Sequence, residues 1–215
     1  MSEYTYNNKG LYNKYNKAHK EREELDYYAT PINETTNILN QLDIDFNGMT
    51  ILEPAAGGGH MVQGILDYLN DKKQTAKVIG TDVRMRDVLV TAAPFMNAGD
   101  KYDFLADNYP ISQADYVIMN PPYSAITPFV LRGLEIAQKG LLLLARVQFL
   151  EGKERYDIIL KDNPPSDIYI YVDRIKCYKN GDFSQTESSV QCYAWFYWNK
   201  ETTTTETHTH WIRRA

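Results

Sequence analysis

The sequence has little of what stabilises small secreted proteins or crosses a membrane. Its 215 residues include two cysteines, Cys177 and Cys192, which are too few for a disulfide framework. The longest uninterrupted apolar run is Leu141–Ala145, far shorter than the ~20 residues that a membrane helix needs. The N-terminal residues MSEYTYNNKG contain no apolar stretch like that of a signal peptide. We therefore expect a cytoplasmic protein without a membrane partner.

An excess of positive charge is also missing. The chain has 23 Lys and Arg against 28 Asp and Glu, a net charge of −5, so the total does not indicate a strong nonspecific affinity for nucleic acid. Basic residues nevertheless outnumber acidic ones in the first 20 residues and in residues 132–180. A polyanion is expected to meet these segments rather than the acidic segment 43–131.

Strand-like and helix-like segments alternate along residues 27–215, which we expect to form one domain. Residues 1–26, rich in Tyr, Asn and Lys, are expected to be a flexible N-terminal arm. The expected strands are residues 49–52, 77–81, 102–105, 115–119, 141–147, 168–172 and 191–198. The expected helices are residues 31–42, capped by Thr30, and residues 61–69, 88–95, 129–137 and 154–160. This alternation predicts an α/β fold: a mostly parallel sheet covered by helices on both faces, with a terminal antiparallel strand.

A glycine-rich turn follows the first of these strands. Residues 53–60 read EPAAGGGH, and the small residues let the backbone approach a ligand closely, while the following helix N-terminus favours a negative group. The next strand ends in Asp82, whose carboxylate can accept hydrogen bonds from the hydroxyls of a ribose. The pattern matches neither GxGxxG nor a Walker loop. It predicts a nucleotide-like ligand, with a glycine turn that binds nothing as the alternative.

A second motif, Asn120-Pro121-Pro122-Tyr123, follows the strand at 115–119. Because ligands lie beyond the carboxyl ends of parallel strands, this turn should face the same ligand. The two prolines stiffen the turn and remove backbone donors, which leaves the Asn120 side-chain oxygen and the Pro121 carbonyl as acceptors for an exocyclic amino group. Tyr123 offers an aromatic face to a planar base. The alternative is a rigid turn that only ends a strand.

Taken together, EPAAGGG, Asp82 and NPPY resemble the motifs of class I S-adenosylmethionine-dependent methyltransferases that modify amino groups, especially N6-adenine DNA methyltransferases. Other stretches are similar to small phage and mobile-element adenine methylases; they are residues 28–31 (YATP), 103–105 (DFL), 149–153 (FLEGK) and 195–198 (WFYW). The resemblance spans roughly residues 27–213. It implies a Rossmann-like methyltransferase fold, S-adenosylmethionine as cofactor, no metal, and the cytoplasm of a bacterium or a phage-infected host cell.

The resemblance also implies a role for each matched residue. Asn120 and Pro121, with Pro122 in the same turn, would accept hydrogen bonds from the target amine, and Tyr123 would stack on its ring. The implied cofactor-binding residues are Tyr28, Thr30, Pro31, Glu53, Ala55, Ala56, Gly57, Gly59, Asp82, Val83, Asp103, Phe104 and Asn120. Among these, Glu53 and the glycine turn would hold the methionine part, Asp82 the ribose, and Phe104 the adenine. The implied reaction is direct methyl transfer to the N6 amine of an adenine flipped out of DNA.

The sequence departs from full-size restriction-modification enzymes in one respect. Only 92 residues follow Tyr123, and the sheet is expected to need most of them, so we expect no separate target-recognition domain. Target recognition is then expected to be weak, or to come from the N-terminal arm and loops, a second subunit or a homodimer. Candidate phosphate contacts are Lys153, Arg155, Arg174 and Lys176, with ordinary solvent-facing cations as the alternative.

Several alternatives for the function stay open at this point. The methyl acceptor could be cytosine N4, an RNA base or a protein glutamine, and the chain could be a non-catalytic cofactor-binding subunit that positions nucleic acid for a partner. The intact NPPY motif argues against the last of these. His208 and His210 have no acidic or cysteine cluster at ligand spacing, so we expect no metal site.

Overall fold

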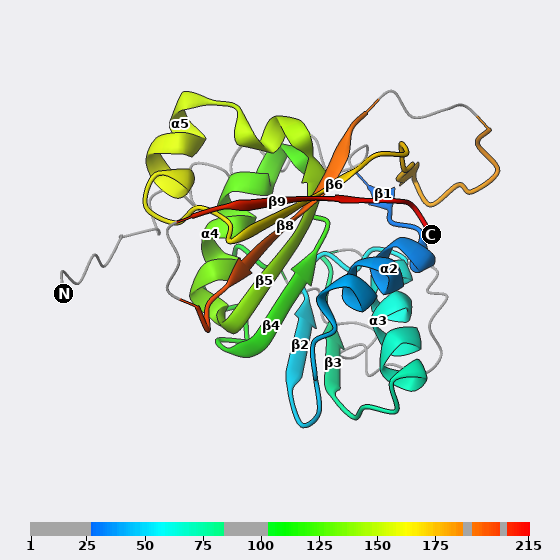
Figure 1. The fold of residues 1–215 in the computed structure, drawn as a ribbon. Coiled ribbons are helices and arrows are strands. Elements are labelled where there is room, and N and C mark those ends of the chain that lie inside the picture. The colour runs from blue at the N-terminus through cyan, green and yellow to red at the C-terminus, as the bar shows by residue number, and fades with distance from the viewer. Residues whose placement is uncertain (1–26, 84–102, 187–190, 203–205) are drawn as a thin grey trace.

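The computed structural model describes residues 27–83, 103–186, 191–202 and 206–215. The expected N-terminal arm and the expected helix at 88–95 lie outside the described residues. Within them, the chain forms a seven-stranded sheet with helices on both faces and a second sheet of two short strands (Figure 1). None of the helices in these ranges has the length and hydropathy to cross a membrane.

The strand order of the large sheet is β3-β2-β4-β5-β8-β6-β9. The strands are β2 (Thr50–Glu53), β3 (Lys77–Gly80), β4 (Ala114–Met119), β5 (Ala137–Arg146), β6 (Asp167–Tyr171), β8 (Tyr193–Asn199) and β9 (His208–Ile212). Strands β3, β2, β4 and β5 are parallel to one another. Strand β8 runs antiparallel between β5 and β6, and β9 pairs in parallel with β6 at the sheet edge. The predicted α/β fold, mostly parallel with an antiparallel strand, is confirmed.

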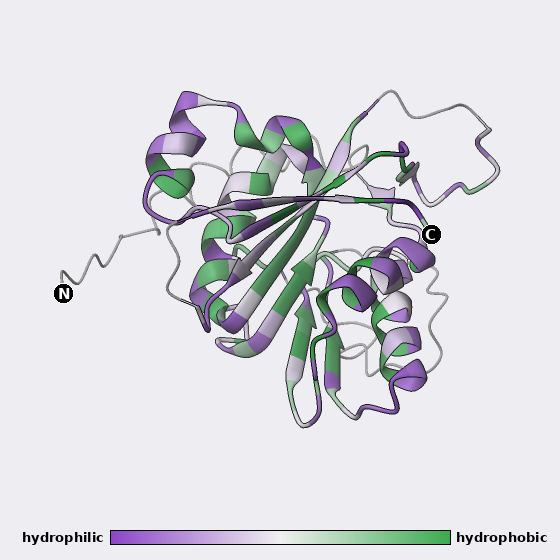
Figure 2. Cartoon of the chain, viewed as in Figure 1, coloured by the Kyte–Doolittle hydropathy of each residue, from purple (hydrophilic) through white to green (hydrophobic). Residues whose placement is uncertain are grey.

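Helices cover both faces because the central strands are apolar on both sides. Helices α2 (Ile32–Leu42) and α3 (His60–Asp71) lie on one face; α4 (Ile126–Ile136), the short α5 (Lys153–Arg155) and the π-helical turn η3 (Tyr156–Leu160) lie on the other. Successive strand side chains point to opposite faces, so Leu141 and Leu143 pack under α4 while Leu142 and Leu144 pack under α2 and α3. Figure 2 shows these apolar strands between helices whose outer sides are polar. Double-sided burial explains the apolar run in the sequence.

The second sheet holds the start of the described chain against the large sheet. Strand β1 (Tyr28–Ala29) pairs antiparallel with β7 (Tyr178–Lys179). The backbone N–H of Asn180 adds a hydrogen bond of 2.8 Å to the carbonyl of Tyr27. Residues 27–30 consequently lie beside the turns that follow β2 and β4.

Three local expectations are wrong. Thr30 does not cap α2: Pro31 stands at the cap position without a side-chain cap hydrogen bond, because the Thr30 hydroxyl is paired with Asn120. Residues 103–105 form a turn rather than a strand, since the Asp103 carboxylate accepts a hydrogen bond from the Leu105 N–H at 2.9 Å. Helix α4 begins at Ile126, before the expected residue 129.

The contact between α2 and α3 generates a stability prediction. A Cβ added at Gly64 would lie 2.6 Å from the backbone carbonyl oxygen of Ile32 and 2.6 Å from the Cβ of Thr35, and neither atom can move alone. We expect Gly64→Ala to lower the free energy of unfolding by about 1–3 kcal/mol, despite the higher helix propensity of alanine. Urea unfolding measures this change. In Gly133→Ala, the matched control in α4, the added Cβ meets the ends of two flexible side chains, Leu141 at 3.1 Å and Met119 at 3.3 Å, so equal losses in both variants would contradict the prediction.

Candidate functional site

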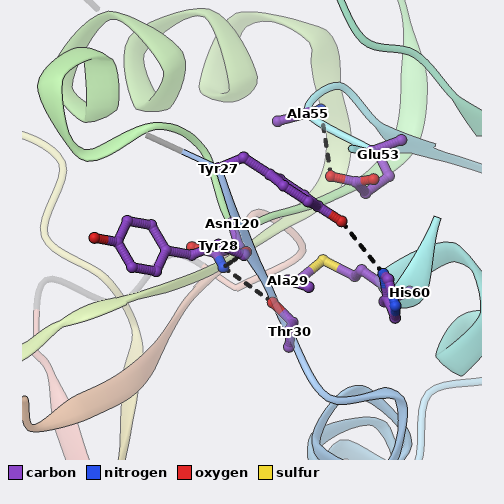
Figure 3. Close-up of a pocket in the computed structure, with 10 residues that line it drawn as sticks. Tyr27, Tyr28, Ala29, Thr30, Glu53, Ala55, His60 and Asn120 are labelled. Atoms are coloured by element: carbon purple, nitrogen blue, oxygen red, sulfur yellow. Dashed lines mark hydrogen bonds between the residues drawn. The ribbon is translucent and has the colours of Figure 1, made fainter. Parts of the chain in front are cut away.

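A pocket opens at the carboxyl ends of β2 and β4, next to residues 27–30 (Figure 3). Its lining residues are Tyr27, Tyr28, Ala29, Thr30, Glu53, Ala55, Ala56, His60, Met61 and Asn120. The fold thus brings together side chains from the YATP, EPAAGGG and NPPY motifs, which are distant in sequence.

The glycine turn between β2 and α3 is folded tightly and ordered by the neighbouring strand. Gly57 and Gly59 have φ values of 52° and 81°, in the left-handed region that favours glycine, and Gly59 occupies the N-terminal cap position of α3. The Asp82 carboxylate accepts a hydrogen bond from the Gly57 N–H at 2.8 Å. Asp82, which directly precedes Val83, therefore helps to shape this turn from the end of β3.

Tyr27 lies on the glycine turn, although it belongs to none of the sequence motifs. Its hydroxyl accepts a hydrogen bond from the Gly58 N–H at 2.9 Å and lies 3.4 Å from Nδ1 of His60. A Cβ at Gly58 would lie 2.7 Å from that hydroxyl, so the absence of a side chain there makes room for the phenol. The only sequence signal was the position of Tyr27 directly before YATP.

Glu53 is a buried carboxylate with an unused acceptor. It is 1% exposed; one oxygen accepts a hydrogen bond from the Ala55 N–H at 3.3 Å, and Oε2 has no hydrogen-bond partner among the described residues. Burial, and secondarily the nearby Asp82, raise the pKa of Glu53 well above its ordinary value. Burial also lowers the pKa of His60. Oε2 of Glu53 therefore lacks a donor in a pocket wall, where a bound cation or N–H group would supply one.

Asn120 joins the NPPY turn to the segment around β1. Its side-chain amino group donates to the hydroxyl of Thr30 at 3.0 Å and to the backbone carbonyl of Tyr28 at 3.2 Å (Figure 3). Pro121 is buried and Pro122 partly buried, and the carbonyl of Pro122 accepts a hydrogen bond from Ala125 that starts the helical turn toward α4. The Asn120 side chain is thereby held from two sides.

The Tyr123 ring is fixed by neighbouring side chains. Its hydroxyl is 2.6 Å from that of Tyr193, the guanidinium of Arg146 lies 4.2 Å from the ring centroid, and the Tyr28 ring centroid lies 5.3 Å away. Burial is the main cause that raises the pKa of Tyr123, so its phenol is neutral at physiological pH. Tyr123 contacts Tyr28, which lines the pocket, but Tyr123 itself is not among the lining residues.

The expected adenine-binding residues do not line this pocket. Phe104 is 1% exposed and packs against Tyr109 and Phe129, with centroid distances of 5.2 and 5.0 Å. Asp103 is exposed at the start of its turn. Phe104 is thus a core residue in this structure.

The four candidate phosphate contacts fall into two groups. Arg155 donates to the backbone carbonyls of Phe149 and Glu151 at 2.7 and 2.6 Å, and Lys176 donates to that of Gln185 at 2.7 Å. Lys153 and Arg174 are exposed. The first pair stabilises loops, and the second pair is exposed to solvent.

The C-terminal histidines belong to the edge of the sheet. Nε2 of His210 is 2.9 Å, and Nδ1 of His208 is 4.0 Å, from the same oxygen of Asp167, so these contacts join β9 to β6. Across the part of the chain that the structure describes, no group of three or more His, Cys, Asp or Glu side chains could hold a metal ion.

The raised pKa of Glu53 predicts a pH-dependent stability difference. Burial disfavours the charged form, so the stability that the protonated form retains at low pH is lost as pH rises from the ordinary glutamate value through the folded-state pKa. We expect the free energy of unfolding of Glu53→Gln to be close to that of wild type at pH 4.5. Above this pH the variant should become more stable than wild type, by on the order of 1 kcal/mol for each pH unit until the folded-state pKa of Glu53 is reached. Urea unfolding of both proteins at several pH values measures the difference. A difference that does not change with pH would contradict this assignment.

Comparison with known proteins gives matches in structure alone. No family model and no curated protein sequence matches the chain. A type I restriction-modification methyltransferase subunit from Streptococcus thermophilus superposes with a TM-score of 0.64 at 15% identity, over 88% of this chain and 47% of that one. A protein from Listeria monocytogenes assigned as a class I S-adenosylmethionine-dependent methyltransferase superposes with a TM-score of 0.58 at 14% identity, over 96% of this chain and 72% of that one. A Pyrococcus horikoshii protein assigned as an RNA methyltransferase superposes with a TM-score of 0.56 at 20% identity, over 89% of this chain and 98% of that one.

These similarities concern the fold. The chain spans about half the length of the Streptococcus thermophilus subunit. This chain, with its mostly parallel sheet and the antiparallel strand β8, superposes on the first two of these proteins over 88% and 96% of its length. The chain therefore has the Rossmann-like fold of class I methyltransferases.

Proposed function

We propose that this chain transfers the methyl group of S-adenosylmethionine to the N6 amine of an adenine flipped out of DNA. The observation that carries the proposal is the position of the Asn120 carboxamide, which lines the same pocket as the buried carboxylate of Glu53. The Asn120 carboxamide can accept a hydrogen bond from the amine that receives the methyl group. The Glu53 carboxylate can accept one from the ammonium of the cofactor's methionine part.

The residues of the glycine turn fit the cofactor. The unpartnered Oε2 of Glu53 is an acceptor for the ammonium of the methionine part. The Gly58 N–H and the N-terminus of α3 suit its carboxylate, and the glycines leave room for close approach. Asp82 lies next to this turn, where it would receive the ribose. When bound, the cofactor supplies an electrophilic methyl group on a sulfonium.

The NPPY turn supplies orientation rather than an acid or a base. An exocyclic aromatic amine is a poor nucleophile because its lone pair is delocalised into the ring. Hydrogen bonds to the Asn120 side-chain oxygen and the Pro121 carbonyl would hold the two amine hydrogens and direct the lone pair at the methyl group. Tyr123 and Tyr28 provide an aromatic surface for the base. The proton lost from nitrogen passes to water after transfer.

DNA as the substrate is supported by the similarity to the Streptococcus thermophilus restriction-modification subunit, which is a similarity of fold. The exposed Lys153 and Arg174 would contact phosphates. A second subunit or a second copy of the chain would supply target recognition. The similarity to the Pyrococcus horikoshii protein makes an RNA base the second candidate for the methyl acceptor.

Nucleoside mass spectrometry tests the proposal directly. The protein is expressed in a host without adenine methylases, and DNA and RNA are digested separately. We expect N6-methyladenine in DNA from cells with wild type, and at least a 100-fold decrease with Asn120→Ala, because the acceptor that orients the amine is gone. Equal urea unfolding midpoints of the two proteins are the control for folding.

The other outcomes are equally informative. N6-methyladenine confined to RNA, or N4-methylcytosine in DNA, would retain the chemistry and change the substrate. Cofactor binding without any modified base would contradict an autonomous nucleic-acid methylase and favour a non-catalytic subunit or a protein substrate. A chain that binds neither S-adenosylmethionine nor S-adenosylhomocysteine would contradict the whole proposal.

Tyr27 provides a separate prediction about cofactor affinity. Its hydroxyl occupies the Gly58 N–H that the methionine carboxylate would use, so the ring and the cofactor compete for one position. Removing the ring should raise the fraction of binding-competent protein, and we expect Tyr27→Ala to bind S-adenosylhomocysteine about 3- to 10-fold more tightly in calorimetry. Tyr156→Ala, at a tyrosine 54% exposed and outside the pocket, should leave the affinity unchanged. Weaker binding by Tyr27→Ala would mean that the ring is part of the cofactor site.

A further inference from the structure

We infer that Thr30 is a positioning residue: together with the backbone carbonyl of Tyr28, it fixes the orientation of the Asn120 carboxamide, so that its oxygen and not its amino group faces the methyl acceptor. The orientation itself follows from contacts within the chain. Its consequence for methyl transfer rests on the proposed function.

The carbonyl of Tyr28 determines which end of the carboxamide faces β1. A carboxamide has two ends of similar size, one accepting and one donating hydrogen bonds. The carbonyl oxygen of Tyr28 can only accept, and it lies 3.2 Å from the terminal atom of Asn120 that faces it. That atom is therefore the amino nitrogen, because two oxygens facing each other at this distance would repel.

Thr30 holds the second hydrogen of the same amino group. Its hydroxyl oxygen lies 3.0 Å from Nδ2 of Asn120, and its side chain also hydrogen-bonds with Cys177. Thr30 is 3% exposed and Cys177 is 7% exposed, and burial raises the pKa of the Cys177 thiol to about 12. A neutral thiol can accept the hydroxyl proton of Thr30, which leaves the oxygen lone pairs of Thr30 for Asn120. The Asn120 amino group thus has two oxygen acceptors at 3.0 and 3.2 Å, and the Cys177 sulfur lies 4.0 Å from the same nitrogen as a longer third contact.

With its amino group satisfied on this side, Asn120 presents only an acceptor to the pocket. Its Oδ1 makes no hydrogen bond with any described residue, and Asn120 lines the pocket beside Glu53. A flipped carboxamide would direct N–H groups at the hydrogens of an amine and would repel it. The hydroxyl of Thr30 therefore favours a methyl acceptor whose amino group donates to Oδ1 of Asn120 over a carbonyl group, which can only accept hydrogen bonds.

Three variants test the inference by kinetics. Thr30→Val keeps the shape and removes the hydroxyl, and we expect kcat for methyl transfer to DNA to fall about 10-fold or more, because the carboxamide then samples both orientations. Because Thr30 also lines the pocket, kcat is measured at saturating S-adenosylmethionine, so that a change in cofactor affinity does not affect it. Thr30→Ser, which restores a hydroxyl, should recover most of kcat. Thr36→Val is the matched control, since the Thr36 hydroxyl bonds the backbone carbonyls of Ile32 and Gly64 and not Asn120.

The side-chain amide signal gives a readout that does not depend on activity. The NH₂ pair of Asn120 in a ¹H–¹⁵N spectrum is assigned by its loss in Asn120→Asp. In wild type we expect slow exchange with water and shifts unlike those of exposed asparagines, because both hydrogens are bonded. Thr30→Val should shift the pair and speed its exchange, whereas Thr36→Val should leave it unchanged.

The outcomes separate the inference from the proposed function. An NH₂ pair that is unaffected by Thr30→Val, or a variant whose kcat is unchanged while its cofactor affinity falls, would overturn the positioning role. Failure of Thr30→Ser to recover kcat would also overturn it. A wild type that transfers no methyl group to nucleic acid, but whose Asn120 signal responds to Thr30→Val as described, would support the orientation and contradict the proposed function.

Discussion

The hydrogen bonds between the Asn120 side chain and the segment Tyr28–Thr30 join two parts of the chain that 90 residues separate. They depend on β1 lying beside the end of β4, where its pairing with β7 holds it. Because adjacent side chains of an extended segment point in opposite directions, Tyr27 contacts the glycine turn while Tyr28 contacts Tyr123. Residues 27–30 therefore contact both the glycine turn and the side chain of Asn120, and displacement of this segment would alter both contacts at once.

The pocket also concentrates groups whose burial is costly in the isolated protein. Oε2 of Glu53 has no partner among the described residues, and the carboxyl group of Asp82 lies close enough to raise the pKa of Glu53 further. Two acidic groups near one glycine turn are unfavourable until a donor or a cation arrives. This arrangement is expected of a binding site, since the same contacts that weaken the free protein would strengthen its complex.

Much of this architecture could be predicted from the sequence, and the exceptions have physical causes. Alternating apolar segments were sufficient for the parallel sheet, because strands buried on both faces leave a continuous apolar signal, as in Leu141–Leu144. The motifs placed Glu53 and Asn120 at one end of the sheet. The role of Tyr27 could not be predicted, since it depends on the contact between residues far apart in sequence. Thr30 has the features of a helix cap, yet a tertiary hydrogen bond to Asn120 takes its hydroxyl instead. The roles assigned to cofactor and target residues by resemblance are still predictions.

The position of β8 has a consequence for biosynthesis. Residues 193–199 insert between β5 and β6, although both of those strands leave the ribosome earlier. Until residue 199 has been synthesised, one hydrogen-bonding edge of β5 stays open, and this strand carries the most apolar segment of the sequence. An unpaired apolar edge is a site for association between nascent chains. Between synthesis of β5 and synthesis of β8, the nascent chain therefore lacks the strand that covers this edge in the folded protein.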